Sequence, residues 1–375
     1  MSKSLVRKLG KREDSAKADE FIKFPKKLPF TQKERIVFHG LVKFPELNDQ
    51  KLSKKLKVKR PTVTAIRNKL RRRNLYSPYV IPNFGLLGYE LMTFIWGKSS
   101  FPVPLEEQMK VPEIKKAMES PEIVFQIVTD NEFFSFLIFK NFTAFKKMQD
   151  GFVEVYKKYS GNESNVHIVH FPFETSKVSS LFDYSLLLKN LFELKFEEKK
   201  AALKPKTLIG LREREKLVLG ALVKYPGLKD SEIAKKIAIT RQTVSKIKSK
   251  LMKQRALKFV NEPNFKKIGC ELFVNTHTKF NTQIASNKRE LLVEKAKKNC
   301  PTVFDVESNA EEVCTGLFED FLSFKIAQDE LMKIYKQNDL LLDELVTQLI
   351  PIPQIKFYRI DFVSITEKAL NIKIP

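Results

Sequence analysis

Residues 41–70 read LVKFPELNDQKLSKKLKVKRPTVTAIRNKL, and residues 222–251 read LVKYPGLKDSEIAKKIAITRQTVSKIKSKL. The offset of 181 continues without a gap to residue 91, and 20 of the 51 positions from Leu41 onward are identical. Further along, the similarity returns at an offset of 179, where Tyr156-Lys157 corresponds to Tyr335-Lys336. Solenoid repeats are only about 20–50 residues long, so this period indicates that a whole folding unit has been duplicated.

The repeat and the composition divide the chain into six segments. Each unit begins with a small module, called here a head, and continues into a larger one, called a body. We predict a flexible basic arm over residues 1–30, heads over 31–83 and 212–264, bodies over 84–196 and 265–375, and a charged linker over 197–211.

Positive charge is concentrated in the two heads. The chain has 375 residues, with 68 Lys and Arg against 44 Asp and Glu, and a net charge of +24. The first head has a net charge of +11 and the second +9, whereas the bodies have −2 and −1. Charge needed only for solubility would be spread more evenly. The distribution therefore predicts two polyanion-binding modules on nearly neutral bodies.

The composition also excludes several classes of protein. Three Cys without a CxxC pair argue against a disulfide scaffold or a zinc ribbon. The longest apolar run, near residues 133–139, is far shorter than the roughly 20 residues of a membrane helix. The chain contains no glycine-rich phosphate loop, and its four His have no metal-ligand spacing. We therefore expect no cofactor or metal, and a cytoplasmic, nucleoid-associated protein.

Each head is predicted to be a winged helix-turn-helix. In the first head, Thr31 and Glu34 have the spacing of a capping box at the start of a helix. We expect a second helix over residues 49–56 with Asp49 as its N-cap, a tight turn, a third helix over 60–73 and a wing strand over 75–81. The second head repeats this pattern, and a third helix after a short turn is typical of DNA-binding helices.

The third helix of each head has a cationic, polar face opposite its apolar one. With Val63, Ile66 and Leu70 facing the core, the other side combines Arg and Lys with small polar residues. Cations bind phosphates and small polar groups bind base edges, so this face suits a DNA groove. A merely solvated face is the alternative, but both copies keep the charge. The candidate DNA-binding residues are Arg60, Thr62, Thr64, Arg67, Asn68, Arg71 and Arg72 in the first head, and Arg241, Gln242, Thr243, Ser245, Lys246, Lys248, Ser249 and Lys253 in the second.

Each body has the order of elements of a ferredoxin-like domain. We expect strands over 91–96, 122–129, 132–140 and 164–171 and helices over 105–119 and 142–159, which is βαββαβ with its repeat in the second body. The fold class is therefore α+β, with two tandem units that each join a winged helix-turn-helix to a ferredoxin-like domain.

The passage Pro-Asn-Phe-x-x-Leu-Gly-Tyr-Glu-Leu at residues 82–91 and the helix at residues 62–70 resemble the Lrp/AsnC family of archaeal and bacterial regulators. The resemblance covers most of each half. It implies DNA-binding heads, bodies that pair with each other, and an amino-acid effector. Family members normally have one such unit per chain, so we expect the two bodies to pair within one molecule, with possible homo-oligomers.

The turn that usually contains a glycine in this family reads Thr129-Asp130-Asn131 here, and Ser308-Asn309-Ala310 in the second body. The missing glycine argues against a standard amino-acid pocket. Some relatives of this fold are decarboxylases of haem synthesis, for which we expect a histidine-rich segment after the wing. Residues 76–97 contain no His, so the sequence predicts that the chain is not an enzyme.

The leading hypothesis is a sequence-specific DNA-binding transcription regulator with two non-identical recognition helices on an intramolecular pseudo-dimer. The alternative is a nucleoid-architectural protein that binds DNA with little sequence preference. An RNA-binding protein is a third reading, but the Phe residues that could stack on bases alternate within strands of the bodies and are expected in the core.

Overall fold

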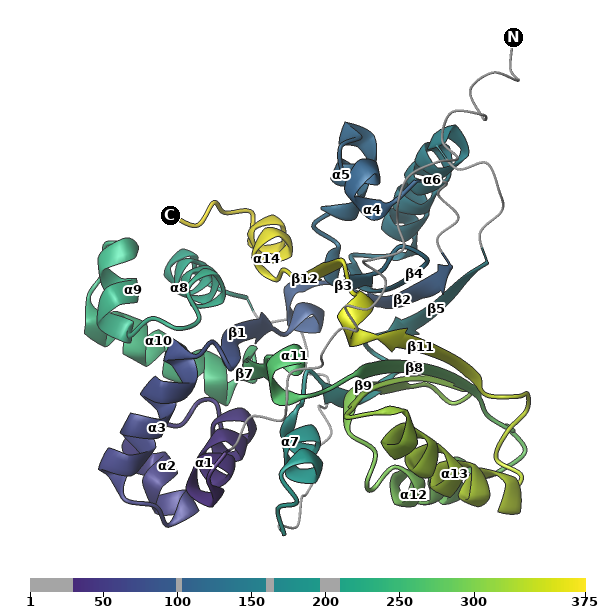
Figure 1. Ribbon diagram of the computed structural model, residues 1–375. Coiled ribbons are helices and arrows are strands. Elements are labelled where there is room, and N and C mark those ends of the chain that lie inside the picture. The colour runs from purple at the N-terminus through teal and green to yellow at the C-terminus, as the bar shows by residue number, and fades with distance from the viewer. Residues whose placement is uncertain (1–29, 99–102, 160–164, 196–209) are drawn as a thin grey trace, which may run out of the picture.

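The computed structural model describes residues 30–98, 103–159, 165–195 and 210–375. The predicted basic arm, except for Phe30, and the predicted linker, except for its last two residues, lie outside these ranges. Figure 1 shows the two heads on one side of the molecule and the two bodies on the other, with a short two-stranded ribbon among the heads. The fold class is α+β, as predicted, with two five-stranded antiparallel sheets.

The heads consist of three helices each, close to the expected positions. The first has α1 (Gln32–Lys43), α2 (Asp49–Leu56) and α3 (Arg60–Arg72), and the second has α8 (Glu213–Lys224), α9 (Asp230–Lys236) and α10 (Arg241–Lys253). The capping box of Thr31 and Glu34 is present. The N-cap of α2 is Asn48 and not Asp49, because the Lys51 backbone N–H donates to Asn48 Oδ1 at 2.9 Å. This leaves the Asp49 carboxylate available for α3.

The strand expected as a wing pairs between the heads. Strand β1 (Tyr76–Pro82) lies antiparallel to β7 (Leu257–Pro263), its counterpart in the second half, and the two form a separate two-stranded sheet. Helix α8 contacts β1, and helix α1 contacts β7. Each head therefore packs on the strand of the other head as well as on its own.

The bodies have the predicted βαββαβ order, with one difference. The expected helix over residues 105–119 is two short helices, α4 (Leu105–Gln108) and α5 (Pro112–Met118), because Pro112 lacks the N–H that a continuous helix needs and fits the first turn of a new one. The first sheet contains β2 (Leu91–Lys98), β3 (Ile123–Val128), β4 (Glu132–Phe139) and β5 (Val166–Pro172), and the second β8 (Leu272–Lys279), β9 (Thr302–Glu307), β10 (Glu311–Phe318) and β11 (Val346–Pro351). The other helices of the βαββαβ units are α6 (Phe142–Tyr159), α12 (Ser286–Ala296) and α13 (Phe321–Gln337). Three short helices lie beside the sheets: η1 (Phe84–Leu87), α11 (Phe265–Ile268) and η2 (Ile352–Gln354).

The fifth strand of each sheet comes from the other half of the chain. Strand β6 (Lys177–Leu181) pairs with β9 in the second sheet, and β12 (Phe357–Ile360) pairs with β3 in the first. The two strands correspond at the offset of 179, so the exchange is reciprocal. The chain then returns to its own head, where α7 (Ser185–Leu191) contacts α1 and α14 (Val363–Leu370) contacts α8. These extensions thus tie both halves together.

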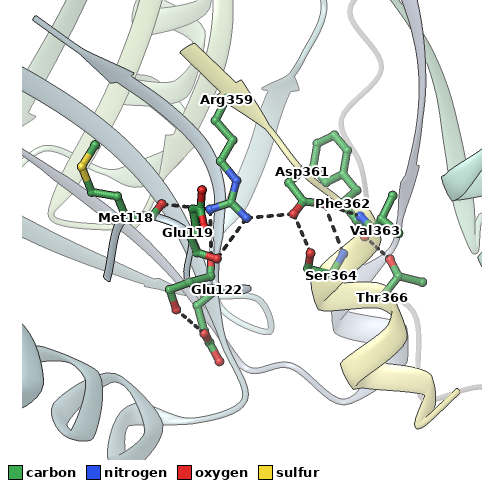
Figure 2. Close-up of polar contacts among 10 residues, drawn as sticks. Met118, Glu119, Glu122, Arg359, Asp361, Phe362, Val363, Ser364 and Thr366 are labelled. Carbon is green, nitrogen blue, oxygen red and sulfur yellow. Dashed lines mark hydrogen bonds and ion pairs between the residues drawn. The ribbon is translucent and has the colours of Figure 1, made fainter. Parts of the chain in front are cut away.

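One end of the exchanged strand β12 is anchored by Arg359 and Asp361 (Figure 2). The Arg359 guanidinium donates to the backbone oxygens of Met118, Glu119 and Ser120 at 2.9, 3.2 and 3.3 Å, at the end of α5. Asp361 accepts from Arg359 at 2.8 Å and from the backbone N–H of Val363 at 2.8 Å, at the start of α14. The Arg359 guanidinium thus bonds to backbone carbonyl groups at the C-terminal end of α5, which have no partner within that helix. The Asp361 carboxylate does the same for backbone N–H groups at the start of α14.

The two sheets pack face to face through aromatic rings. The ring of Phe304 in β9 lies 5.1 Å from that of Phe125 in β3 and 5.5 Å from that of Phe136 in β4, measured between centroids. Phe134 lies 5.2 Å from Phe273 across the same interface. All of these side chains are almost fully buried. The two bodies therefore share one core within a single chain, which explains the high Phe content without a role in stacking on bases.

Candidate nucleic-acid interface

The two third helices present the predicted faces. Val63, Ile66 and Leu70 are buried in α3, and their counterparts Val244, Ile247 and Leu251 are buried in α10. On the opposite side, the exposed residues are Arg60, Pro61, Ala65, Asn68, Arg71 and Arg72 in the first head, and Arg241, Gln242, Ser245, Lys246, Ser249 and Lys253 in the second. Thr62, Thr64, Arg67, Thr243 and Lys248 are half-buried.

Two carboxylates fix the orientation of α3. Asp49 of α2 accepts from Arg67 Nε and from Thr64 Oγ1, both at 2.6 Å. Arg67 also donates to the Leu47 backbone oxygen at 3.1 Å, and only 13% of its side chain is exposed. Glu34 of α1 binds Lys69 at 2.5 Å. The structure thus places Arg67 and Thr64 in the joint between helices, facing Asp49.

The second head repeats both ion pairs, with Lys248 in place of Arg67 in one of them. Lys248 donates to Asp230 at 3.0 Å, and Lys250 donates to Glu215 at 2.6 Å. Burial opposes ionisation of Glu34, but the bonds from Lys69 and Thr31 outweigh it and hold the pKa of this carboxyl below its ordinary value. The bond from Lys250 likewise lowers the pKa of Glu215. Asp49 corresponds to Asp230 in the repeat, and Glu34 corresponds to Glu215. Both copies therefore orient the third helix in the same way.

Three side-chain hydrogen bonds, besides the backbone pairing of the ribbon, also link the two halves of the chain near the heads. Asn261 Nδ2 donates to the Leu41 backbone oxygen at 2.7 Å, and Lys267 Nζ donates to the Arg73 backbone oxygen at 2.9 Å. In the other direction, Asn83 Nδ2 donates to the Arg255 backbone oxygen at 3.3 Å. The exposed faces of α3 and α10 are therefore presented by one connected scaffold and not by two independently tethered modules.

A second cluster gathers residues that the sequence analysis did not connect. The Trp96 ring stacks on His167 at 5.3 Å and meets His277 edge-on at 5.6 Å, measured between centroids. His277 Nε2 lies 2.9 Å from Glu311 Oε2. These residues are up to 215 positions apart in the sequence, so their spacing carried no signal. They lie at the interface of the two sheets and belong to the bodies, not to the heads.

In the part of the chain that the structure describes, no helix combines the length and the apolar character needed to cross a bilayer. Within the same ranges, no three His, Cys, Asp or Glu side chains are grouped in a way that could hold a metal ion.

No family model matches the chain, and no curated protein matches it. Among solved structures, the siroheme decarboxylase NirDL is similar at 11% identity, covering 91% of this chain and 98% of that chain with a TM-score of 0.47. NirDL in complex with an iron-uroporphyrin III analogue is similar at 12% identity, covering 90% and 98% with a TM-score of 0.46. PH0061 is similar at 16% identity, covering 41% of this chain and all of that chain with a TM-score of 0.31.

The prediction that the chain is not an enzyme is corrected by these comparisons. It was based on the absence of His between residues 76 and 97, but a protein similar along nine-tenths of this chain is a decarboxylase.

Proposed function

We propose that this protein is a DNA-binding transcription regulator of the Lrp/AsnC type whose two recognition helices read different half-sites. The observation that carries the proposal is the pair of exposed, cationic third helices, α3 and α10, joined through a ribbon of corresponding strands. In helix-turn-helix dimers, two such helices enter successive major grooves of one duplex. The concentration of charge in the heads supports the same conclusion, because phosphate contacts dominate the affinity of DNA-binding proteins.

The exposed centres of the two helices differ in chemistry. Asn68 has the geometry to bond adenine bidentately, and Ala65 suits the methyl group of thymine. Lys246 in the second head favours guanine, with Ser245 and Ser249 beside it. We therefore expect an asymmetric site, rich in A/T under the first head and with at least one G contact under the second.

The competing proposal is an architectural protein with little sequence preference. Both proposals use the same phosphate contacts, so affinity alone does not separate them. The exposed small polar residues, Asn68, Gln242 and Ser249, favour sequence reading, because a purely electrostatic surface has no need of them.

Selection from a random duplex library with the full chain tests the proposal. We expect a motif with two unlike halves, and binding that weakens steeply as salt rises. Asn68→Ala should relax the preference in one half only, and Lys246→Ala in the other. Lys116→Ala, which removes an exposed charge from α5 in the first body, is the matched control and should leave the motif and the affinity unchanged. A perfect palindrome or the absence of any motif would contradict the proposal, and the second result would favour the architectural protein.

A further inference from the structure

The second body contains a cavity of about 50 Å³ between the outer face of its sheet and the two helices that cover it. Val274, Phe318, Phe324 and other apolar side chains line one part of it. Gln328 and Leu345 also line it and are partly exposed, so the cavity reaches the surface. A volume of this size has room for a few water-sized groups.

The other part of the cavity wall carries a buried ionic cluster. Lys297, directly after α12, donates from Nζ to Asp305 Oδ1 at 2.9 Å and to Glu312 Oε1. These three side chains are 4%, 5% and 1% exposed, respectively. The strand pairing explains why they meet, since Asp305 and Cys314 are opposite each other in β9 and β10, and Glu312 is two positions from Cys314 on the same face. Buried ionic groups are commonly less stabilising than apolar residues of the same volume, so this cluster needs an explanation.

Tyr335 of α13 supplies a second and independent sign of a ligand. Its side chain is fully buried and lines the same cavity, yet its hydroxyl has no hydrogen-bond partner. A buried hydroxyl without a partner costs free energy, on the order of 1–3 kcal/mol, unless something else bonds to it. The cavity therefore offers an unused donor and acceptor beside the ionic cluster.

One ammonium, Lys297, faces two carboxylates, Asp305 and Glu312. Burial raises the pKa of Glu312 to about 8, with Asp305 and Glu307 adding to the rise and Lys297 opposing it. Burial opposes the charge of Lys297, but the carboxylates hold its pKa well above the ordinary value.

Glu307 has its own partner in Lys177, at 2.8 Å. Cys300, Cys314 and Tyr335 also line the cavity, and burial raises the pKa of Cys314 and of Tyr335. Glu312 thus shares the Lys297 ammonium with Asp305 and holds its proton at neutral pH.

The first body has no corresponding ionic cluster. At the repeat positions of Lys297, Asp305 and Glu312 it has Met118, Gln126 and Phe133. Met118 lies in an apolar cluster against which Phe133 packs. The same fold is therefore built in one copy with uncharged residues at these three positions, so the fold does not require the ionic residues of the other.

We propose that the second body binds a small aliphatic primary amine, as its ammonium ion, in this cavity. The ammonium group bonds to Glu312 and the Tyr335 hydroxyl and takes the place of the Glu312 proton. The short alkyl chain lies against Val274, Phe318 and Phe324. An amino acid of similar size is excluded, because its carboxylate would face the two carboxylates of the cluster. The proposal is independent of DNA binding, since it involves neither head.

Calorimetric titration of the full chain with n-propylamine tests this inference, with 1-propanol and propionate as probes of the same size. We expect binding of propylamine only, in the millimolar range or somewhat tighter given four non-hydrogen atoms. Glu312 gives up its proton when the ammonium enters, so at pH 7 binding should release up to one proton. The measured enthalpy should therefore differ between two buffers of unlike ionisation enthalpy. Equal binding of propanol, or preferential binding of propionate, would overturn the proposal.

Variants assign the binding to this cavity. Glu312→Gln should weaken propylamine binding at least about tenfold and abolish the proton release. Tyr335→Phe removes only the unpartnered hydroxyl, so it should fold normally and weaken binding about fivefold. Glu344→Gln, an exposed carboxylate in the same body, is the matched control and should change nothing. Unchanged binding in Tyr335→Phe, or no binding of any probe to the unmodified protein, would overturn the proposal.

Discussion

Tyr79 lies directly opposite Val260 in the β1–β7 ribbon, and the two residues occupy corresponding positions in the two repeats. An approximate twofold axis therefore passes through this pair, because exchanging the two strands leaves an antiparallel register unchanged. The neighbouring pairs follow the same rule, since Pro78 faces Asn261 and Val80 faces Phe259. One chain thus builds the symmetric arrangement that two identical chains form in a dimer.

The exchange of strands predicts that neither half is stable alone. A chain of residues 1–195 lacks β12 beside β3, and a chain of residues 196–375 lacks β6 beside β9, which leaves an unpaired sheet edge in each. Each half also exposes its side of the aromatic interface. Sedimentation velocity should show each half to be aggregated or self-associated, and co-expression should restore one compact complex. Two monomeric, soluble halves would contradict the shared core.

The Asp49 carboxylate should contribute to the stability of the first head. Asp49→Ala leaves Arg67 and Thr64 without their shared acceptor, and we expect a loss of about 2 kcal/mol in the free energy of unfolding. Chemical denaturation measures this loss. Glu107→Ala breaks an exposed ion pair with Lys110 in the first body and should change the stability by less than about 1 kcal/mol. Equal effects of the two substitutions would mean that Asp49 does not anchor α3.

Arg72 is the better probe of phosphate contacts in the first head. It is exposed at the end of α3, whereas Arg67 is bound to Asp49, so Arg67→Ala would lower stability before it affected DNA. Arg72→Ala should weaken binding to all duplexes and reduce the slope of log K against log salt by about one. Fluorescence anisotropy at several salt concentrations measures the slope, with Lys116→Ala as the control. A slope identical to that of the unmodified protein would exclude Arg72 from the interface.

Exchanging the exposed residues of α10 for those of α3 should make the preferred DNA site more symmetric. The triple substitution Ser245→Thr, Lys246→Ala and Ser249→Asn gives the second head the central residues of the first. Each lost base contact should cost about 1–3 kcal/mol of discrimination. Library selection with the variant should return two similar half-sites, and an unchanged asymmetric motif would show that these positions do not read bases.

Glu262 should make the stability of the protein depend on pH. This buried carboxylate of β7 accepts hydrogen bonds from Tyr184, at 2.9 Å, and from Tyr358. Burial raises its pKa to about 7, although the tyrosine hydroxyls oppose the rise. In the unfolded chain, Glu262 has the ordinary pKa of about 4.3. Between this pKa and the pKa of the folded state, the folded protein therefore binds more protons than the unfolded chain. The free energy of unfolding falls as pH rises through this range.

Glu262→Gln removes this titration while keeping the shape of the side chain. The free energy of unfolding should then fall less steeply between pH 5 and 7, by up to one proton or about 1.4 kcal/mol per pH unit. Above pH 7 the variant should be more stable than the unmodified protein. Denaturation at a series of pH values measures both effects, and an identical pH profile would exclude Glu262 as a titrating group.

The sequence by itself determined what local patterns and the repeat encode. The duplication, the three helices of each head, the buried face of α3 and the capping box at Thr31 all depend on residues within a few turns of one another, and the structure agrees with each. The order of elements in the bodies was predictable for the same reason. Only the split of the helix over residues 105–119 at Pro112 differed.

The tertiary structure alone decided which elements meet. Periodicity shows that a segment is a strand, but it does not name its partner, so neither the β1–β7 ribbon nor the exchange of β6 and β12 could be read from it. The same limit applies to the sites. The sequence predicts Arg67 to be a phosphate contact, whereas in the structure it binds Asp49. Lys297, Glu312 and Tyr335 form one cluster only because a strand pair and two helices bring them together. Contacts between distant residues depend on how a whole core packs, and no short stretch of sequence contains that information.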